Sequence, residues 1–241
     1  MRITPSNQSN FQLIRQLLQG YGPSAENIKL FEQLKTILLT APTAAGRNSV
    51  ISKLAEKGNY HYLVSDTTRK PRYNNDVLEK NGQVYWFKTE KEFLKSLEEK
   101  NYLEAAIIHN QQASGINISE ILNAKNNNKY AITDIDIVGC ETLIRLSKNT
   151  LPIFLLPPNF TIWMNRLKGR GQLSDDELNR RLQSAKTELT HALEKQYFQF
   201  IVNDILDETV DKIDNLVERG INVDDQVLAR NKAKELLKNL N

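Results

Sequence analysis

The sequence has few of the residues that several classes of protein need. It contains one cysteine, Cys140, and three histidines that are far apart. A single cysteine forms no internal disulfide, and scattered histidines without cysteine partners do not form a zinc-binding pattern. No apolar run approaches the roughly 20 residues that a bilayer span requires, and the N-terminal residues lack the apolar segment of a secretory signal. We therefore expect a soluble, cytoplasmic protein without a membrane partner.

An excess of charge of one sign is also missing. The chain has 32 basic and 29 acidic residues, which gives a net charge of +3. This balance does not favour nucleic-acid binding, which usually requires a basic stripe. With 241 residues, of which 40% are hydrophobic and 25% charged, the chain is long enough for one large or two small domains and is not of a disordered or collagen-like class.

Short apolar runs alternate with helical patterns along most of the chain. The runs typical of buried strands are residues 36–40, 62–64, 130–132, 153–156 and 200–202. The helical patterns are residues 50–57, 138–147, 161–170 and 178–194. This alternation predicts a parallel sheet that is covered by helices on both faces. A less regular piece, residues 71–108, interrupts the alternation with a strand at 84–87 and a helix that opens at a Thr89 capping box.

Helical patterns flank this α/β region at both ends. Residues 1–34 form two short helices with Ser9 and Ser24 as N-caps. We interpret them as an appended docking pair, with a partner-binding arm as the alternative. A charged helix over residues 224–241 ends the chain. Its expected apolar side consists of Val227, Leu228, Leu236 and Leu237.

The segment that follows the first strand has the context of a phosphate loop. It reads A-P-T-A-A-G-R-N-S over residues 41–49 and leads into a helix. In the pattern GxxxxGK[ST], backbone N–H groups and the helix N-terminus hold phosphates. Gly46 matches this pattern, whereas Ala41, Arg47 and Asn48 replace its first glycine, its lysine and its hydroxyl. Ala41 is compatible with the loop if its φ stays negative, and Arg47 keeps the charge in a longer, planar group. Taken alone, so degenerate a match also fits an ordinary turn between a strand and a helix.

Seven further segments carry a family resemblance. They are S-D-T-T-R-K-P-R at 65–72, G-Q-V-Y-W-F at 82–87, Y-L-E at 102–104, T-D-I-D at 133–136, R-L-K-G-R-G at 166–171, N-R-R at 179–181 and V-N-D at 202–204. In this order and spacing they resemble guanylate kinase over about residues 35–219. The resemblance implies a P-loop NTPase-type α/β fold in a domain at 35–220, with an inserted GMP-binding subdomain at 68–118 and a helical lid region at 159–195. The domain would lie between an N-terminal helical extension, residues 1–34, and a C-terminal helix, residues 221–241.

The resemblance also implies an activity: Mg²⁺- and ATP-dependent phosphorylation of GMP or dGMP by a nucleoside monophosphate kinase. The residues expected to bind ATP are Ala41, Thr43, Ala44, Ala45, Gly46, Arg47, Asn48, Ser49 and Asn203. The residues expected to stabilise the transferred phosphoryl group are Arg47 and the lid arginines Arg166, Arg170 and Arg181. Those expected to bind GMP are the phosphate clamp Arg69, Arg72 and Tyr85, and the guanine-reading residues Ser65, Glu104 and Asp134. Asn48 and Asp136 would hold Mg²⁺, the latter through water, and Glu79 matches the family's acidic residue before the tyrosine.

The acceptor segment departs from the family pattern. In residues 110–115 Ala113 replaces a tyrosine and Gly115 replaces a hydroxyl, unless a slipped register lets Ser114 serve. Val138 replaces a glutamine. Two alternatives therefore accompany the kinase: a catalytically impaired guanylate kinase-like binding module, and a kinase of a different phosphorylated acceptor. The terminal helices offer surfaces for a protein partner or for self-association.

Overall fold

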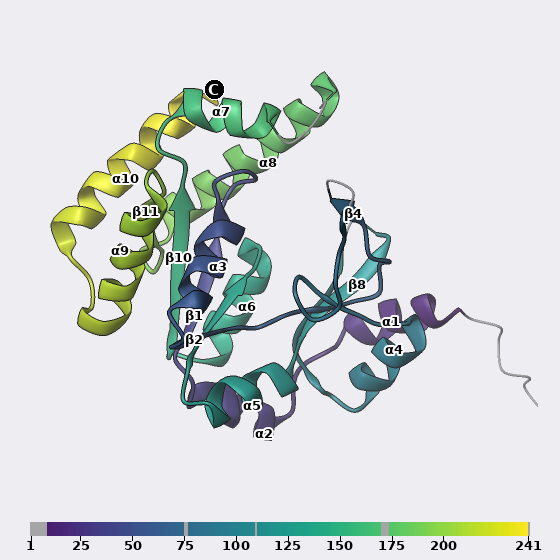
Figure 1. The fold of residues 1–241 in the computed structure, drawn as a ribbon. Coiled ribbons are helices and arrows are strands. Elements are labelled where there is room, and N and C mark those ends of the chain that lie inside the picture. The colour runs from purple at the N-terminus through teal and green to yellow at the C-terminus, as the bar shows by residue number, and fades with distance from the viewer. Residues whose placement is uncertain (1–8, 75–76, 109, 170–173, 241) are drawn as a thin grey trace, which may run out of the picture. The chain divides into compact units, whose positions relative to one another are not determined.

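A computed structural model describes residues 9–74, 77–108, 110–169 and 174–240. The chain divides into two compact units. Unit 1 comprises residues 1–34 and 63–128, and unit 2 comprises residues 35–62 and 129–241 (Figure 1). No helix in the described parts of the chain is long and apolar enough to cross a membrane.

Unit 2 is built on a five-stranded parallel sheet. Its strands are β1 (Thr36–Thr40), β2 (Tyr60–Tyr62), β9 (Tyr130–Asp134), β10 (Thr150–Leu156) and β11 (Gln199–Val202), in the order β11-β10-β1-β9-β2. All neighbouring strands run parallel, and every residue of the central strand β1 is buried. The predicted parallel sheet is therefore confirmed. The second strand lies at 60–62 rather than 62–64, because Tyr60 pairs with Tyr130 and the chain has already left the sheet at Leu63.

Helices cover this sheet. They are α3 (Arg47–Glu56), α6 (Ile137–Leu146), α7 (Phe160–Lys168), α8 (Asp175–Glu194), α9 (Leu206–Arg219) and α10 (Val223–Lys238). One core cluster joins the apolar faces of α3 and α9 to Ile37 and Leu39 of β1, while α6 packs against β1 and β10. In α6 the Cys140 thiol is buried, which raises its pKa to about 12, so this side chain is a packed residue and not a nucleophile.

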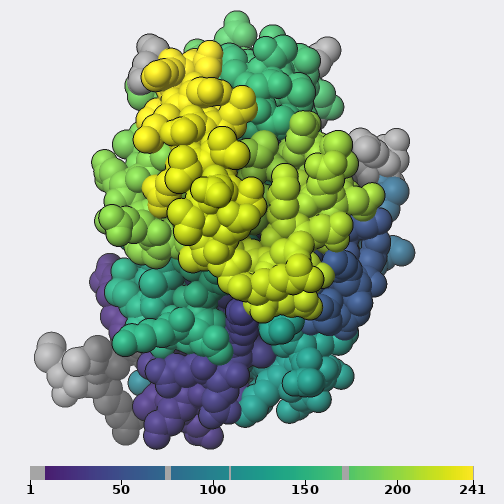
Figure 2. Space-filling model, turned by 90° about the vertical axis from the view of Figure 1, so that its left-hand side faces the viewer, coloured from purple at the N-terminus to yellow at the C-terminus, as the bar shows by residue number. Residues whose placement is uncertain are grey.

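The C-terminal helix differs from its predicted pattern. Figure 2 shows α10 and α9 side by side on the surface. Leu236 is buried as expected, but Val227 and Leu228 are exposed, and the inner face is completed by Ala229 and Ala233. These small residues let α10 approach β11 and α8 closely, so the larger side chains lie on the other side of the helix.

Unit 1 contains a four-stranded mixed sheet. Its strands are β3 (Asp66–Thr67), β6 (Trp86–Phe87), β7 (Tyr102–Ile108) and β8 (Gln112–Asn117), in the order β6-β3-β8-β7, and β4 (Tyr73–Asn74) pairs with β5 (Val77–Leu78) in a separate ladder. The predicted strand 84–87 is shorter, because Tyr85 forms only an isolated bridge with Asn81. Trp86 is half-buried and donates its indole N–H to Glu120 at 3.0 Å.

Four helices complete unit 1. They are α1 (Asn10–Leu18), α2 (Ala25–Glu32), α4 (Glu90–Glu98) and α5 (Ile118–Asn126), and the predicted N-caps Ser9, Ser24 and Thr89 all accept backbone N–H groups. Ile14 of α1 packs in one apolar cluster with Phe93 and Tyr102. The Tyr21 hydroxyl donates to the carbonyl of Tyr102 at 2.6 Å and accepts its N–H at 3.0 Å. The N-terminal helices are thus packed parts of unit 1.

Candidate active site

The segment between β1 and α3 forms a tight loop. Gly46 is the N-cap of α3 with φ 94° and ψ 18°, a left-handed conformation that glycine adopts without strain. Ala44 also has a positive φ of 68°, which costs a residue with a Cβ about 1 kcal/mol or more. Ala41 keeps a negative φ, as its side chain requires. The left-handed turns that shape the loop are therefore at 44 and 46.

Side chains from two other elements hold the loop in this shape. The indole N–H of Trp163 in α7 donates to the carbonyl of Thr43 at 2.8 Å. The amide of Asn203, directly after β11, donates to the carbonyl of Ala45 at 2.7 Å. With its carbonyls bonded in this way, the loop leads into the N-terminus of α3, where unpaired N–H groups and the helix dipole favour an anion.

A cavity of about 480 Å³ adjoins this loop. It is lined by Ala44, Gly46, Ser49, Arg166, Gly169, Asn203, Asp204 and Leu206. The guanidinium of Arg166 donates to the carbonyl of Asn203 at 3.2 Å, so one lid arginine is fixed at the cavity wall. The structure thus brings the loop and Asn203, two parts of the predicted ATP site, together with the predicted lid arginine Arg166.

Arg47 contacts a residue that was assigned to the other substrate. Its guanidinium lies 3.6 Å from the Oδ2 of Asp134 and donates to the carbonyl of Ile135 at 3.4 Å. The other oxygen of Asp134 accepts the hydroxyl of Tyr62 at 2.5 Å. Asn48 and Ser49, in the first turn of α3, are exposed. The charge that replaces the loop lysine is therefore paired at the end of β9.

Glu188 is a functional candidate that the sequence reading missed. Burial raises the pKa of its carboxyl to about 7; nearby Arg47 acts in the opposite direction, and Asp136 adds to the rise. The signal was present, because Ala185, Glu188, Leu189 and Ala192 share one face of α8 and the other three are buried. A glutamate on the inner, apolar face of an amphipathic helix indicates a buried carboxyl with a shifted pKa, which is common at functional sites.

Magnesium has a limited set of oxygen ligands here. The Oδ1 of Asp136 accepts the N–H of Gly139 at 2.7 Å and so caps α6. The side chain is exposed, so its carboxylate still reaches solvent. The described residues contain no group of three or more histidine, cysteine or acidic side chains placed to hold a metal. One carboxylate with Asn48 and Ser49 oxygens fits Mg²⁺, which keeps several waters and binds substrate phosphates.

The lid arginines are only partly described. The Nε of Arg181, in the second turn of α8, donates to the Oε1 of Glu177 at 2.8 Å. Ser174 accepts the N–H of Glu177 and is the N-cap of this helix. Helix α7 ends at Lys168, two residues earlier than expected, and Arg170 lies outside the described residues.

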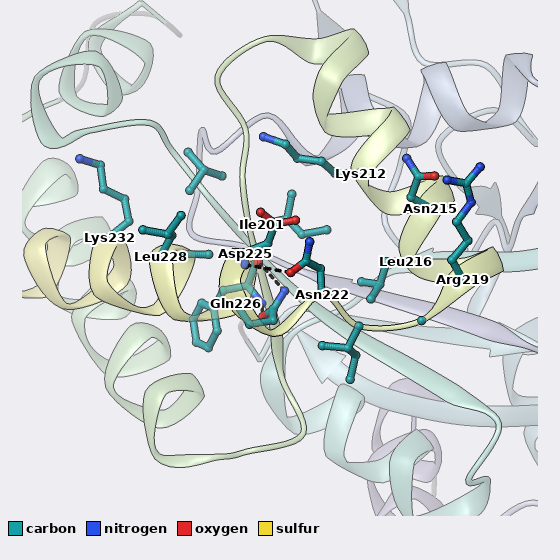
Figure 3. A pocket seen from close by; sticks show the side chains of 15 residues that line it. Ile201, Lys212, Asn215, Leu216, Arg219, Asn222, Asp225, Gln226, Leu228 and Lys232 are labelled. Carbon is teal, nitrogen blue, oxygen red and sulfur yellow. Dashed lines mark hydrogen bonds between the residues drawn. The ribbon is translucent and has the colours of Figure 1, made fainter.

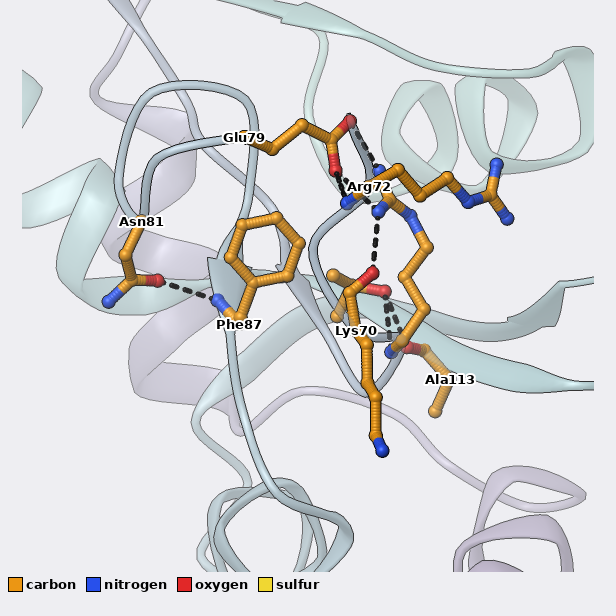
Figure 4. Close-up of polar contacts among 8 residues, drawn as sticks. Lys70, Arg72, Glu79, Asn81, Phe87 and Ala113 are labelled. Atoms are coloured by element: carbon orange, nitrogen blue, oxygen red, sulfur yellow. Dashed lines mark hydrogen bonds and ion pairs between the residues drawn. The ribbon is translucent and has the colours of Figure 1, made fainter. Parts of the chain in front are cut away.

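In unit 1 the predicted phosphate clamp is built around Glu79. The guanidinium of Arg69 forms two bonds with this carboxylate, at 2.6 and 2.9 Å, and lies 4.8 Å from the ring centre of Tyr85. The backbone N–H of Arg72 donates to the same carboxylate at 2.9 Å (Figure 4). The Arg72 side chain is exposed, and its guanidinium has no bonding partner among the described residues. Glu79 thus holds Arg69 in place, while the Arg72 guanidinium stays unpaired in the part of the chain that the structure describes.

The guanine-reading residues are divided between the units. Ser65 and Glu104 are half-buried in unit 1, whereas Asp134 belongs to unit 2. The hydroxyl of Ser114, the alternative to the missing one, donates to the carbonyl of Asp66 at 2.9 Å and keeps its lone pairs as acceptors. A Cβ at Gly115 would lie 2.8 Å from the carbonyl oxygen of Glu104, so no side chain fits there. The close pairing of β7 and β8 therefore requires glycine at position 115, where the family has a hydroxyl side chain.

A buried carboxylate beside this segment was also missed. Asp66 accepts the hydroxyl of Tyr102 at 2.8 Å and the amide of Asn117 at 3.3 Å. Burial raises its pKa. Because both partners belong to β7 and β8, Asp66 ties β3 to the rest of its sheet.

A parallel sheet with a phosphate loop after its central strand, and an arginine-bearing helix beside that loop, defines a P-loop nucleotide-binding protein. Residues 33–220 match the protein-family model described as guanylate kinase. A guanylate kinase of Corynebacterium efficiens is 33% identical over 181 residues, 74% of this chain and 92% of the relative. One of Rickettsia bellii is 32% identical over 75% and 92% of the two chains. The crystal structure of guanylate kinase from Anaplasma phagocytophilum has the same fold, with a TM-score of 0.59 and 24% identity over 82% of this chain and 92% of the other.

The chain belongs to the guanylate kinase family. The predicted resemblance and fold class are confirmed. The family and its relatives indicate a phosphotransferase, and they do not favour the binding module or a kinase of another acceptor.

Proposed function

We propose that the protein transfers the γ-phosphoryl group of ATP to GMP or dGMP, with Mg²⁺ bound to the donor, and that it does so in the cytoplasm, where these nucleotides occur. The observation that carries the proposal is the donor site of unit 2. A braced loop, a helix N-terminus and Arg166 surround a cavity of about 480 Å³. These groups supply N–H donors and positive charge to a polyphosphate, as phosphoryl transfer requires.

On the donor side, the main-chain N–H groups of residues 43–49 hold the β- and γ-phosphates of ATP. Arg47 turns from Asp134 to the γ-phosphate, and Arg166, Arg170 and Arg181 neutralise charge that develops on the transferred group. Asn203 keeps the loop in register through Ala45. Ala41 and Ala44, which carry no functional groups, serve through their backbone.

On the acceptor side, Arg69, Arg72 and Tyr85 bind the phosphate of GMP. Since Glu79 already neutralises Arg69, the free guanidinium of Arg72 supplies the larger share of the attraction. Ser65, Glu104 and Asp134 accept and donate at the guanine edge, and they reject adenine by leaving polar groups unpaired. No side-chain nucleophile takes part, because the acceptor phosphate itself attacks.

Asn48 and, through water, Asp136 would hold Mg²⁺, which would supply positive charge to the donor phosphates when bound. Residues of unit 2 orient the donor phosphates, and the clamp of unit 1 holds the acceptor phosphate. No other cofactor enters the proposal.

A transfer assay with ATP, GMP and Mg²⁺ tests this function. The unmodified protein should form GDP and ADP, and Arg166→Ala should lower kcat by roughly 10²–10³-fold. Lys168→Ala, at an exposed position in the last turn of the same helix, is the matched control and should retain activity. Absence of transfer by the unmodified protein, or equal activity of the two variants, would contradict the proposal.

A further inference from the structure

The C-terminal helix α10 lies outside the residues that match the family, which end at 220. It is nevertheless a packed element, since Ala229, Ala233 and Leu236 are buried. Its role in the protein therefore has to be inferred from the contacts that its side chains make.

One side chain of α10 holds the segment that joins the lid helix to the sheet. The guanidinium of Arg230 donates to the carbonyls of Leu193, Lys195 and Phe198 at 3.2, 2.9 and 3.3 Å. It also lies 4.9 Å from the ring centre of Phe200. The first two carbonyls belong to the last turn and the C-cap of α8, where the helix leaves its carbonyls without intrahelical partners and the dipole favours a cation.

A second side chain fastens α10 to the edge of the sheet. The amide of Gln226, one turn before Arg230, accepts the N–H of Phe200 at 2.8 Å and donates to its carbonyl at 3.2 Å. Gln226 therefore occupies two of the backbone groups that the edge strand β11 presents. Between α9 and α10 the same edge lines a cavity of about 770 Å³ (Figure 3). Beside this cavity, Gln226, Arg230 and the small inner face hold α10 against β11 and α8.

The segment that Arg230 holds connects α8 to β11, and both of these elements carry residues of the donor site. Upstream, α8 carries Glu188 and Arg181. Downstream, β11 ends one residue before Asn203, which bonds the phosphate loop and accepts from Arg166. Beyond α10, Leu240 packs in one apolar cluster with Ala44 of the loop and Trp163 of α7.

We infer that α10 is a positioning element for the donor site, and that Arg230 is its principal positioning residue. By fixing the junction of α8 and β11 from one side, it sets where the arginine of the lid helix and the brace of the phosphate loop lie. The inference rests on the proposed function and extends it to a segment that the family match does not include.

Steady-state kinetics of Arg230→Ala test the inference. This variant should raise KM for ATP about five- to tenfold, while KM for GMP stays within about twofold, because α10 belongs to unit 2 and the acceptor clamp belongs to unit 1. Lys234→Ala, exposed on the same helix, is the matched control. Arg230→Lys, which keeps the charge but not the three-way geometry, should recover part of the ATP affinity.

Hydrogen exchange separates this inference from the proposed function. Amides in residues 189–200 should exchange faster in Arg230→Ala than in Lys234→Ala, and ATP should bind more weakly by calorimetry, whether or not transfer occurs. If the unmodified protein fails to transfer phosphate but these two differences appear, the proposed function fails and the positioning role stands. Equal KM for ATP and equal ATP affinity in the two variants would overturn the inference, even if Arg230→Ala has a lower Tm.

Should Arg230→Ala fail to fold, Gln226→Ala provides the second test. It removes only the two bonds to Phe200 and should produce a smaller change in KM for ATP in the same direction. No change relative to Lys234→Ala would again overturn the inference.

Discussion

The guanidinium of Arg47 lies 3.6 Å from the carboxylate of Asp134, so the cation of the phosphate loop is paired with a residue proposed to read guanine. In the proposed reaction the donor competes with Asp134 for Arg47, and guanine competes with Arg47 for Asp134. If this proposal holds, binding of ATP would release the Asp134 carboxylate from Arg47 and make it available to GMP.

Asp134→Asn tests this link. The neutral amide holds Arg47 less tightly, so KM for ATP should stay unchanged or fall, whereas KM for GMP should rise about tenfold because a charge-assisted bond to guanine is lost. Tyr62→Phe is the control, since it removes the 2.5 Å bond to Asp134 and leaves Arg47 in place. A rise in KM for ATP in Asp134→Asn would show that the pair supports donor binding instead.

The Glu188 carboxyl gives a pH dependence of stability. Its pKa is about 7 in the folded protein against an ordinary value of 4.5, so folding disfavours its ionisation. Below pH 4.5 both states are protonated and stability is unaffected; as the pH rises to about 7, the unfolded chain releases its proton first and stability falls. The side chain at position 188 in the variant Glu188→Gln cannot ionise. The free energy of unfolding of this variant should therefore exceed that of the unmodified protein as the pH rises, by about 1–3 kcal/mol at pH 8.

Urea unfolding at pH 5 and pH 8 measures the difference. Glu194→Gln, at the exposed end of the same helix, serves as the control and should follow the unmodified protein. A stability difference between Glu188→Gln and the unmodified protein that is the same at both pH values would contradict the assignment.

The Glu79 carboxylate should matter more to the free enzyme than to the complex with GMP. Its side chain and that of Arg69 are 8% and 11% exposed, so Glu79→Ala leaves a buried cation unpaired, at a cost of about 3–5 kcal/mol. The phosphate of GMP replaces part of the lost negative charge. GMP should therefore raise the Tm of Glu79→Ala by more than it raises the Tm of the unmodified protein.

Thermal unfolding with and without GMP checks this expectation. Arg72→Ala lacks the free guanidinium and should show a smaller GMP-induced rise in Tm than the unmodified protein, whereas Lys70→Ala, at an exposed neighbour, should behave normally. Equal GMP-induced shifts in Glu79→Ala and the unmodified protein would indicate that Arg69 does not reach the acceptor phosphate.

Much of the architecture follows from local patterns in the sequence. Continuous apolar runs indicated the five strands of unit 2, and Ser9, Ser24 and Thr89 marked helix starts correctly, because a side-chain oxygen before a helix satisfies free N–H groups there. The same rule applies to Asp136, which precedes α6 and caps it. The family resemblance had suggested only its role as a ligand of Mg²⁺.

The features that escaped prediction depend on contacts between distant parts of the chain. The pairing of Arg47 with Asp134 joins residues 87 positions apart by their numbering, and the lack of space at Gly115 arises from the neighbouring strand β7. Val227 and Leu228 were expected on the inner face of α10, but Gln226 and Arg230 fix the rotation of that helix by bonding to backbone groups elsewhere. A helical pattern does not show which partner a helix will have.

Gly46 offers a sharp test of the phosphate loop. A Cβ at this position would lie 2.2 Å from the Nδ2 of Asn203, and the φ of 94° is unfavourable for any residue with a side chain. Gly46→Ala should therefore break the bond from Asn203 to Ala45, lower stability by about 1–3 kcal/mol and abolish measurable ATP binding.

Gly58 provides the matched control, because its φ is 86° but a Cβ there meets no atom within 4 Å. Gly58→Ala should incur only the backbone strain, about 1 kcal/mol, and should bind ATP normally by calorimetry. Adding Asn203→Ala to Gly46→Ala removes the clash but does not restore the hydrogen bond from Asn203 to Ala45. Stability should therefore recover in part, while ATP binding stays weak. If the double variant binds ATP as the unmodified protein does, the bond between Asn203 and the loop is not what shapes the donor site.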